Sequence, residues 1–141
     1  MRRIHLIVGI LGVIAFLITG QIMKHHDPRM QLLTPEIRMM YVSRHIYLLG
    51  AALVNVALGL YLQVHPPGWR RALQQLGSVL IVLAVLSLLV AFLAEPGMGL
   101  AGRGWRSYFG LIGLFAGTMA HLVARPAQAE LTVVASAPKT E

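Results

Sequence analysis

Four long apolar runs, separated by short polar segments, make up most of this chain. The pattern predicts helices over about residues 4–23, 35–64, 72–94 and 105–125. About twenty apolar residues at a rise of about 1.5 Å reach roughly 30 Å, the thickness of the hydrocarbon core of a bilayer. Because short connections favour antiparallel neighbours, we expect an all-α protein, a four-helix transmembrane bundle with antiparallel up-down topology.

The polar segments indicate where the helices begin and end. Thr34-Pro35-Glu36 combines a capping hydroxyl, a proline in the first turn and an acid near the positive end of the helix dipole. We therefore expect the second helix to begin near Pro35, outside the bilayer. The small and polar residues of 127–141 predict a disordered tail, which leaves 1–126 as a single membrane domain.

The composition agrees with a membrane protein and excludes several other classes. Hydrophobic residues make up 57% of the chain and charged residues only 12%, whereas soluble domains carry about 25% charged residues. This excludes a soluble enzyme, a secreted disulfide domain and a disordered chain. Because the chain has no cysteine, it cannot hold a disulfide, a thiolate nucleophile or an iron–sulfur cluster.

The net charge of +7 is explained by the membrane and does not indicate nucleic acid. The basic residues flank the apolar runs, at the level of the lipid headgroups, and no basic stripe alternates with aromatic residues. The 12 Lys and Arg residues divide equally between the two sides of a four-span topology. Arg2-Arg3, directly before the first run, favours both termini in the cytoplasm, with the protein in the cytoplasmic (inner) membrane of a bacterium.

Histidine is the residue type that points to chemistry. Ionisable groups near a membrane tend to face a bundle interior or a cofactor. The predicted topology sorts the six His residues into two layers, one on each side of the membrane, and the third helix contributes none. The first layer holds His5, His65 and His121, and the second holds His25, His26 and His45.

Two His residues on facing helices can ligate a haem iron through neutral imidazole, and bundle cores are where such cofactors lie. The layers allow one haem or two. His5 would pair with His121, and His45 with His26 or His25. Two stacked haems would carry electrons across the membrane.

Other residues near these His residues fit the same hypothesis. The small-residue stripe from Gly110 to Gly117 continues to His121, and small residues let a flat macrocycle, or another helix, approach the backbone. Arg38 or Arg44, in the first turns of the second helix, could pair with the propionates of a haem.

The first run also resembles a known helix. Arg3-Ile4-His5-Leu6, followed by Thr19-Gly20, is similar to the first helix of the bacterial four-helix b-type cytochromes of the inner membrane, although Leu6 stands where that family usually has Trp. In that family helices one, two and four supply the haem ligands. The resemblance implies His5, His45 and His121 as iron ligands, haem b as cofactor, and electron transfer between a quinone pool and a partner.

An alternative is a non-catalytic accessory or scaffold subunit of a larger membrane complex, with its glycine faces as contacts to other membrane subunits. The third run, without His, and the lack of a carboxylate inside any run favour it. All five acids fall in predicted loops or in the tail, so catalysis by side chains alone is not indicated: Asp27, Glu36, Glu95, Glu130 and Glu141.

A third hypothesis is copper handling by the first loop. Thioether and imidazole groups suit Cu(I), and this loop gathers several of both: Met23, His25, His26, Met30, Met39, Met40 and His45. Met residues on an apolar helix usually pack, however, and no regular Met-x-x-Met series is present.

Overall fold

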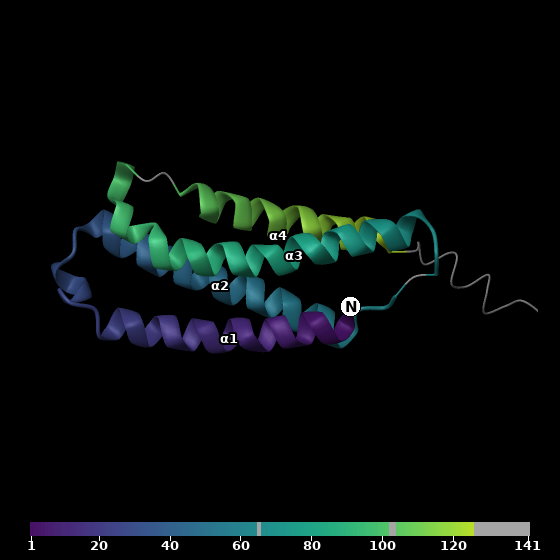
Figure 1. Cartoon of the computed structure of the whole chain (residues 1–141), viewed down its shortest axis with the longest axis horizontal. Helices are drawn as coiled ribbons and strands as arrows, with labels where there is room; N and C mark the ends of the chain where they lie inside the picture. Colours follow the sequence, from purple (N-terminus) through teal and green to yellow (C-terminus); the bar gives the residue numbers. More distant parts are fainter. Residues whose placement is uncertain (65, 102–103, 126–141) are drawn as a thin grey trace, which may run out of the picture.

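The computed structural model describes residues 1–64, 66–101 and 104–125. Four long helices lie side by side and run antiparallel to their neighbours in sequence (Figure 1): α1 (Arg2–Lys24), α2 (Pro35–Tyr61), α3 (Trp69–Ala94) and α4 (Trp105–Ala124). Each is long and apolar enough to cross a membrane. The predicted transmembrane four-helix bundle is thus confirmed.

Two of the predicted helix ends differ from the structure by three residues, and the others by two at most. The second helix begins at Pro35 as predicted, but it ends at Tyr61, before residue 64, and the third begins at Trp69, before residue 72. Gln74 of α3 donates to the carbonyl of Gln63 across 2.7 Å and holds the extended segment that follows α2. The first turn of α3 is polar, which is why hydropathy alone places its start too late.

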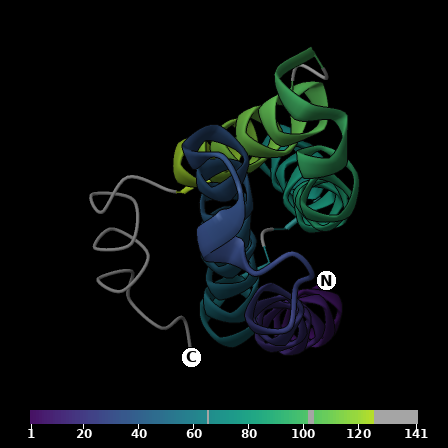
Figure 2. The ribbon, with the colours of Figure 1, turned by 90° about the vertical axis from the view of Figure 1, so that its left-hand side faces the viewer.

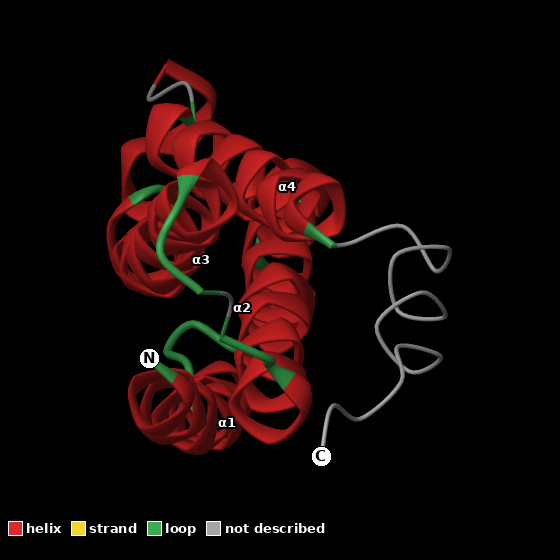
Figure 3. Cartoon of the chain, turned by 90° about the vertical axis from the view of Figure 1, so that its right-hand side faces the viewer, coloured by secondary structure: helices red, strands yellow, loops and turns green. Residues whose placement is uncertain are grey.

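The bundle consists of two helix pairs, α1 with α2 and α3 with α4. Seen end-on, α2 lies between α1 and the α3–α4 pair, and α1 and α4 occupy opposite corners (Figures 2 and 3). The pairs join where α2 meets α3, around a buried cluster of Leu48, Ala51, Val85 and Leu88. Large apolar side chains cover the outside of all four helices, which is the surface that a lipid bilayer covers.

Glycine brings the helices of each pair into close contact. A Cβ built on Gly117 would lie 2.6 Å from Cγ1 of Ile81 and 2.7 Å from the carbonyl oxygen of Gly77. In the other pair, a Cβ on Gly59 would lie 2.7 Å from the backbone of Leu6. Gly117 therefore serves the packing of α4 on α3 inside the chain, and its suggested role beside a cofactor stays a prediction.

Candidate cofactor site

Each of the four helices contributes one polar side chain to a cluster near the end of the bundle that holds the N-terminus. His5 comes from α1, Asn55 from α2, Ser78 from α3 and His121 from α4. His5 is 1% exposed and Asn55 is 0% exposed. Polar groups at such depth are costly unless they are hydrogen-bonded, so the bonds within this four-helix cluster determine what it can do.

Asn55 fixes both the orientation and the tautomer of His5. The Asn55 amide nitrogen donates to the carbonyl of Ala51 across 2.9 Å, so its oxygen faces the ring of His5. His5 Nδ1 therefore carries the proton and donates to Oδ1 of Asn55 across 2.8 Å. The other ring nitrogen, Nε2, is buried and has no hydrogen-bond partner among the described residues. A neutral imidazole thus presents an unused lone pair inside the bundle.

His121 lies beside His5, as the sequence predicted. The ring centres are 6.1 Å apart and the ring planes make an angle of 75°. His121 Nε2 lies within hydrogen-bond distance of the Ser78 hydroxyl, at 3.2 Å. Gly77 leaves room for this ring, because a Cβ there would lie 3.1 Å from Cδ2 of His121. The two imidazoles are held from opposite corners of the bundle by one polar neighbour each.

His45 occupies a separate position towards the other end of the bundle. Its ring stacks on Phe16 at 4.0 Å, with 18° between the planes. Thr19 donates to the carbonyl of Phe16, so the hydroxyl oxygen of Thr19 accepts from Nδ1 of His45 across 2.9 Å. A Cβ on Gly20 would lie 3.4 Å from Cε1 of His45. Thr19-Gly20 therefore positions this ring against α1.

The structure does not place His25 or His26 beside His45. Both ring nitrogens of His26 are engaged, Nδ1 with the carbonyl of Pro28 and Nε2 with the hydroxyl of Tyr41. His25 is exposed and bonds the carbonyl of Gln21 in its own helix. His65 lies outside the described residues. The first layer thus has a pair of imidazoles, whereas His45 in the second layer has aromatic and hydroxyl neighbours.

Arg44, a candidate partner for a haem propionate, is engaged in a buried ion pair. Its Nε donates to Oε2 of Glu95 across 2.6 Å. Glu95 is 0% exposed and also accepts from the backbone N–H and the hydroxyl of Ser107, in the first turn of α4. The carboxylate therefore caps that helix. Arg38, the other candidate, is exposed.

The surroundings of Glu95 set its acidity. Burial alone raises the pKa of this carboxyl, but the hydrogen bonds from Ser107 and Arg44 outweigh it and leave the pKa below its ordinary value. Glu95 is therefore a buried, ion-paired acid, although it stands in a connection between helices. The sequence placed Glu95 in the connection that follows the third helix. In the structure this connection packs back onto α2, and Glu95 bonds Arg44 of α2 and Ser107 of α4.

Asn55 and Ser78 were not identified from the sequence as site residues. Asn55 is an amide in the middle of an apolar run, which is costly unless it has partners, and this signal could have found it. Serine in an apolar helix is common enough that Ser78 gave no such signal. The third helix, which contributes no His, supplies Ser78 to the four-helix cluster and has Glu95 as its C-cap.

Within the parts of the chain that the structure describes, no three His, Cys, Asp or Glu side chains converge to hold a metal ion. A site built from two imidazoles is the arrangement that the described residues offer. No family model, curated protein or solved structure matches this chain.

Proposed function

We propose that this protein is an electron carrier of the bacterial cytoplasmic membrane, with a haem b held between His5 and His121. One observation carries the proposal. His5 is an oriented, neutral imidazole whose buried Nε2 has no partner among the described residues, and a second imidazole lies 6.1 Å away, ring centre to ring centre.

The residues of the four-helix cluster fit a metal between two imidazoles. A buried nitrogen without a partner costs about 1–3 kcal/mol, and coordination to iron would remove that cost. A metal-bound His usually donates its other ring nitrogen to a fixed acceptor, as His5 does to Asn55. A separation of about 6 Å between ring centres suits two imidazoles that face one metal, each nitrogen about 2 Å from it.

The packing indicates where such a group would lie. Glycine contacts close the α1–α2 pair at Gly59 and the α3–α4 pair at Gly77 and Gly117. The boundary between the two pairs is therefore the place for a ligand that both His5 and His121 can reach. Between the four-helix cluster and the ion pair of Arg44 with Glu95, this boundary holds the buried apolar side chains of Leu48, Ala51, Val85 and Leu88. The low dielectric of such a setting tunes a haem potential.

A bound haem would supply reversible one-electron chemistry. The protein's own residues would hold the iron and fix its ligands: His5 and His121 as ligands, Asn55 and Ser78 as the groups that orient their rings. The apolar exterior would let the protein meet a lipid-soluble quinone or neighbouring membrane subunits. A role as the haem subunit of a larger complex is compatible with the same site.

Two features of the structure bear on the alternative of a purely structural scaffold. The glycine stripe of α4 packs on α3, so it is not free to contact another subunit. A buried charge pair is present at Arg44 and Glu95. For the copper hypothesis, both ring nitrogens of His26 are engaged by Pro28 and Tyr41, so neither is free to bind a metal.

The test is an absorption spectrum of the full chain purified from haem-replete cells and reduced with dithionite. We expect Soret and alpha bands, and we expect His5→Ala and His121→Ala each to abolish the bands of this site. His25→Ala is the matched control, because His25 is exposed and bonds only its own helix among the described residues; it should leave the spectrum unchanged. A wild-type protein without these bands would overturn the proposal.

The haem content of these variants, together with that of His45→Ala, decides between one haem and two. If His45 ligates a second haem, His45→Ala should reduce the haem content per protein by about half, and His5→Ala should leave the other half. If the His5–His121 pair holds the only haem, His45→Ala should keep the full content. A pyridine haemochrome assay normalised to protein gives this ratio.

A further inference from the structure

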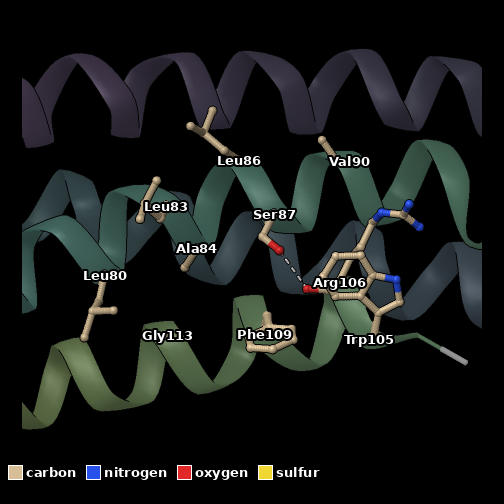
Figure 4. Close-up of a pocket in the computed structure, with 10 residues that line it drawn as sticks. All are labelled: Leu80, Leu83, Ala84, Leu86, Ser87, Val90, Trp105, Arg106, Phe109 and Gly113. Atoms are coloured by element: carbon tan, nitrogen blue, oxygen red, sulfur yellow. Dashed lines mark hydrogen bonds between the residues drawn. The ribbon is translucent and has the colours of Figure 1, made fainter.

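A groove of about 470 Å³ runs along the outer face of α3 and α4 (Figure 4). Leucine and valine side chains of α3 form one wall, and Phe109 and Gly113 of α4 lie on the other side. Its polar lining residues are Ser87, Trp105 and Arg106. Ser87 donates to the carbonyl of Arg106 across 2.8 Å, so its hydroxyl is satisfied and the wall is effectively apolar.

The length of the groove fits one leaflet of a bilayer. Along α3 its lining extends from Leu80 to Val90, and ten residues at about 1.5 Å each give roughly 15 Å, half of the roughly 30 Å hydrocarbon core. A transmembrane helix of another subunit would need a groove along the whole thickness. One acyl chain of a lipid needs only this half.

The charged end of the groove lies where a headgroup would be. Trp105 and Tyr108 are exposed in the first turn of α4, and such aromatic residues mark the membrane interface. The Arg106 guanidinium lies over the Trp105 ring, 5.0 Å from its centre. Among the described residues, no carboxylate lies within ion-pair distance of Arg106. The ion pair that these residues form joins Arg44 to Glu95.

We infer that this groove binds an anionic phospholipid, with one acyl chain along α3 and α4 and the phosphate on Arg106. The apolar lining recognises the chain, and the unpaired cation recognises the negative headgroup. A Cβ on Gly113 would lie 3.4 Å from the carbonyl oxygen of Leu80 and 3.9 Å from Cβ of Ala84, so a larger side chain there would enter the space between α4 and α3 that the groove occupies. This inference is independent of the proposed haem, which involves other residues.

The experiment is native mass spectrometry of the full chain in detergent, with added dioleoylphosphatidylglycerol or dioleoylphosphatidylcholine. We expect retention of one phosphatidylglycerol, and weaker retention of phosphatidylcholine. Arg106→Gln should reduce phosphatidylglycerol retention roughly fivefold, the factor that corresponds to about 1 kcal/mol per basic residue at an anionic surface. Gly113→Leu should reduce retention of both lipids. Arg38→Gln, an exposed arginine of α2, is the matched control and should retain lipid as the wild type does.

Equal retention of the two lipids by the wild type would overturn the inference, as would unchanged phosphatidylglycerol retention in Arg106→Gln. If a second copy of the chain occupied the groove, the spectra would show a dimer that persists with added lipid and dissociates in Gly113→Leu. That outcome would also overturn the inference. Circular dichroism of each variant shows whether the helices are intact. Arg106 is half-buried and forms no ion pair among the described residues, so a loss of lipid from a variant with intact helices reports the loss of its charge.

Discussion

Arg44 of α2 donates its Nε–H to Oε2 of Glu95, 2.6 Å away, in a part of the bundle where the carboxylate has no exposed surface. Ser107 of α4 donates two further hydrogen bonds to the same carboxylate. One acid therefore ties together α2, the end of α3 and the start of α4. These are the elements through which the two helix pairs join, so the interaction fixes how the pairs sit on each other.

The ion pair should show strong coupling between its partners. Removal of one partner from a buried pair leaves an uncompensated charge and typically costs about 3–5 kcal/mol. We expect Glu95→Gln and Arg44→Met each to lower the free energy of unfolding by an amount of this order, and the double variant to lower it by less than the sum. Denaturation in detergent, followed by circular dichroism, measures the cycle. Additive effects would show that the two residues do not depend on each other.

The same carboxylate predicts acid sensitivity. Because the folded protein holds the pKa of Glu95 below its ordinary value, its contribution to stability is complete above the ordinary carboxyl pKa and is lost as the pH falls through the lowered value. We expect Glu95 to add no pH dependence above about pH 5 and to contribute a fall in stability below it. Glu95→Gln should remove that part of the acid slope, and Glu36→Gln, at an exposed position, should keep it. Parallel slopes for the wild type and Glu95→Gln would contradict this.

The sequence predicted the helices and the two layers of His, and it failed where contacts between distant segments decide the outcome. Apolar length and breaker residues are local properties, which is why Pro35 was placed correctly as the start of α2. The partner of Arg44 could not be predicted, because Glu95 becomes buried only when the connection folds back onto the bundle. The glycine stripe of α4 was compatible with a neighbouring helix or a macrocycle, and only the position of Gly77 on the facing helix shows that Gly117 packs against α3.

The contact between Gly117 and Gly77 predicts that alanine at position 117 lowers the stability of the protein, whereas alanine at position 50 does not. A Cβ at Gly117 would lie 2.7 Å from a backbone oxygen, so the helices must separate, and we expect Gly117→Ala to destabilise the protein by about 1–3 kcal/mol. Gly50 has nothing within 4 Å of the corresponding position, so Gly50→Ala should be neutral or stabilising by up to about 1 kcal/mol. Thermal unfolding of the two variants in the same detergent is the measurement. Similar midpoints for both would show that α3 and α4 do not pack through these glycines.

The bond between Asn55 and His5 predicts a positioning role for Asn55 in the proposed haem site. Asn55→Ala removes the acceptor of His5 Nδ1, and loss of such a partner typically weakens metal binding about 10–100-fold. Asn55→Asp keeps an acceptor and adds negative charge, so it should retain haem while lowering the midpoint potential, because a more basic imidazole favours the oxidised iron.

Redox titration and haem content of both variants test this role. Thr118→Ala is the control, since Thr118 is a half-buried hydroxyl of α4 that donates to Leu114 in its own helix; it should change neither quantity. A purely structural Asn55 would give a different result: both variants would lose stability, and the potential of the haem that remains in Asn55→Asp would equal that of the wild type. The potential therefore distinguishes a residue that tunes His5 from one that only fills space between α1 and α2.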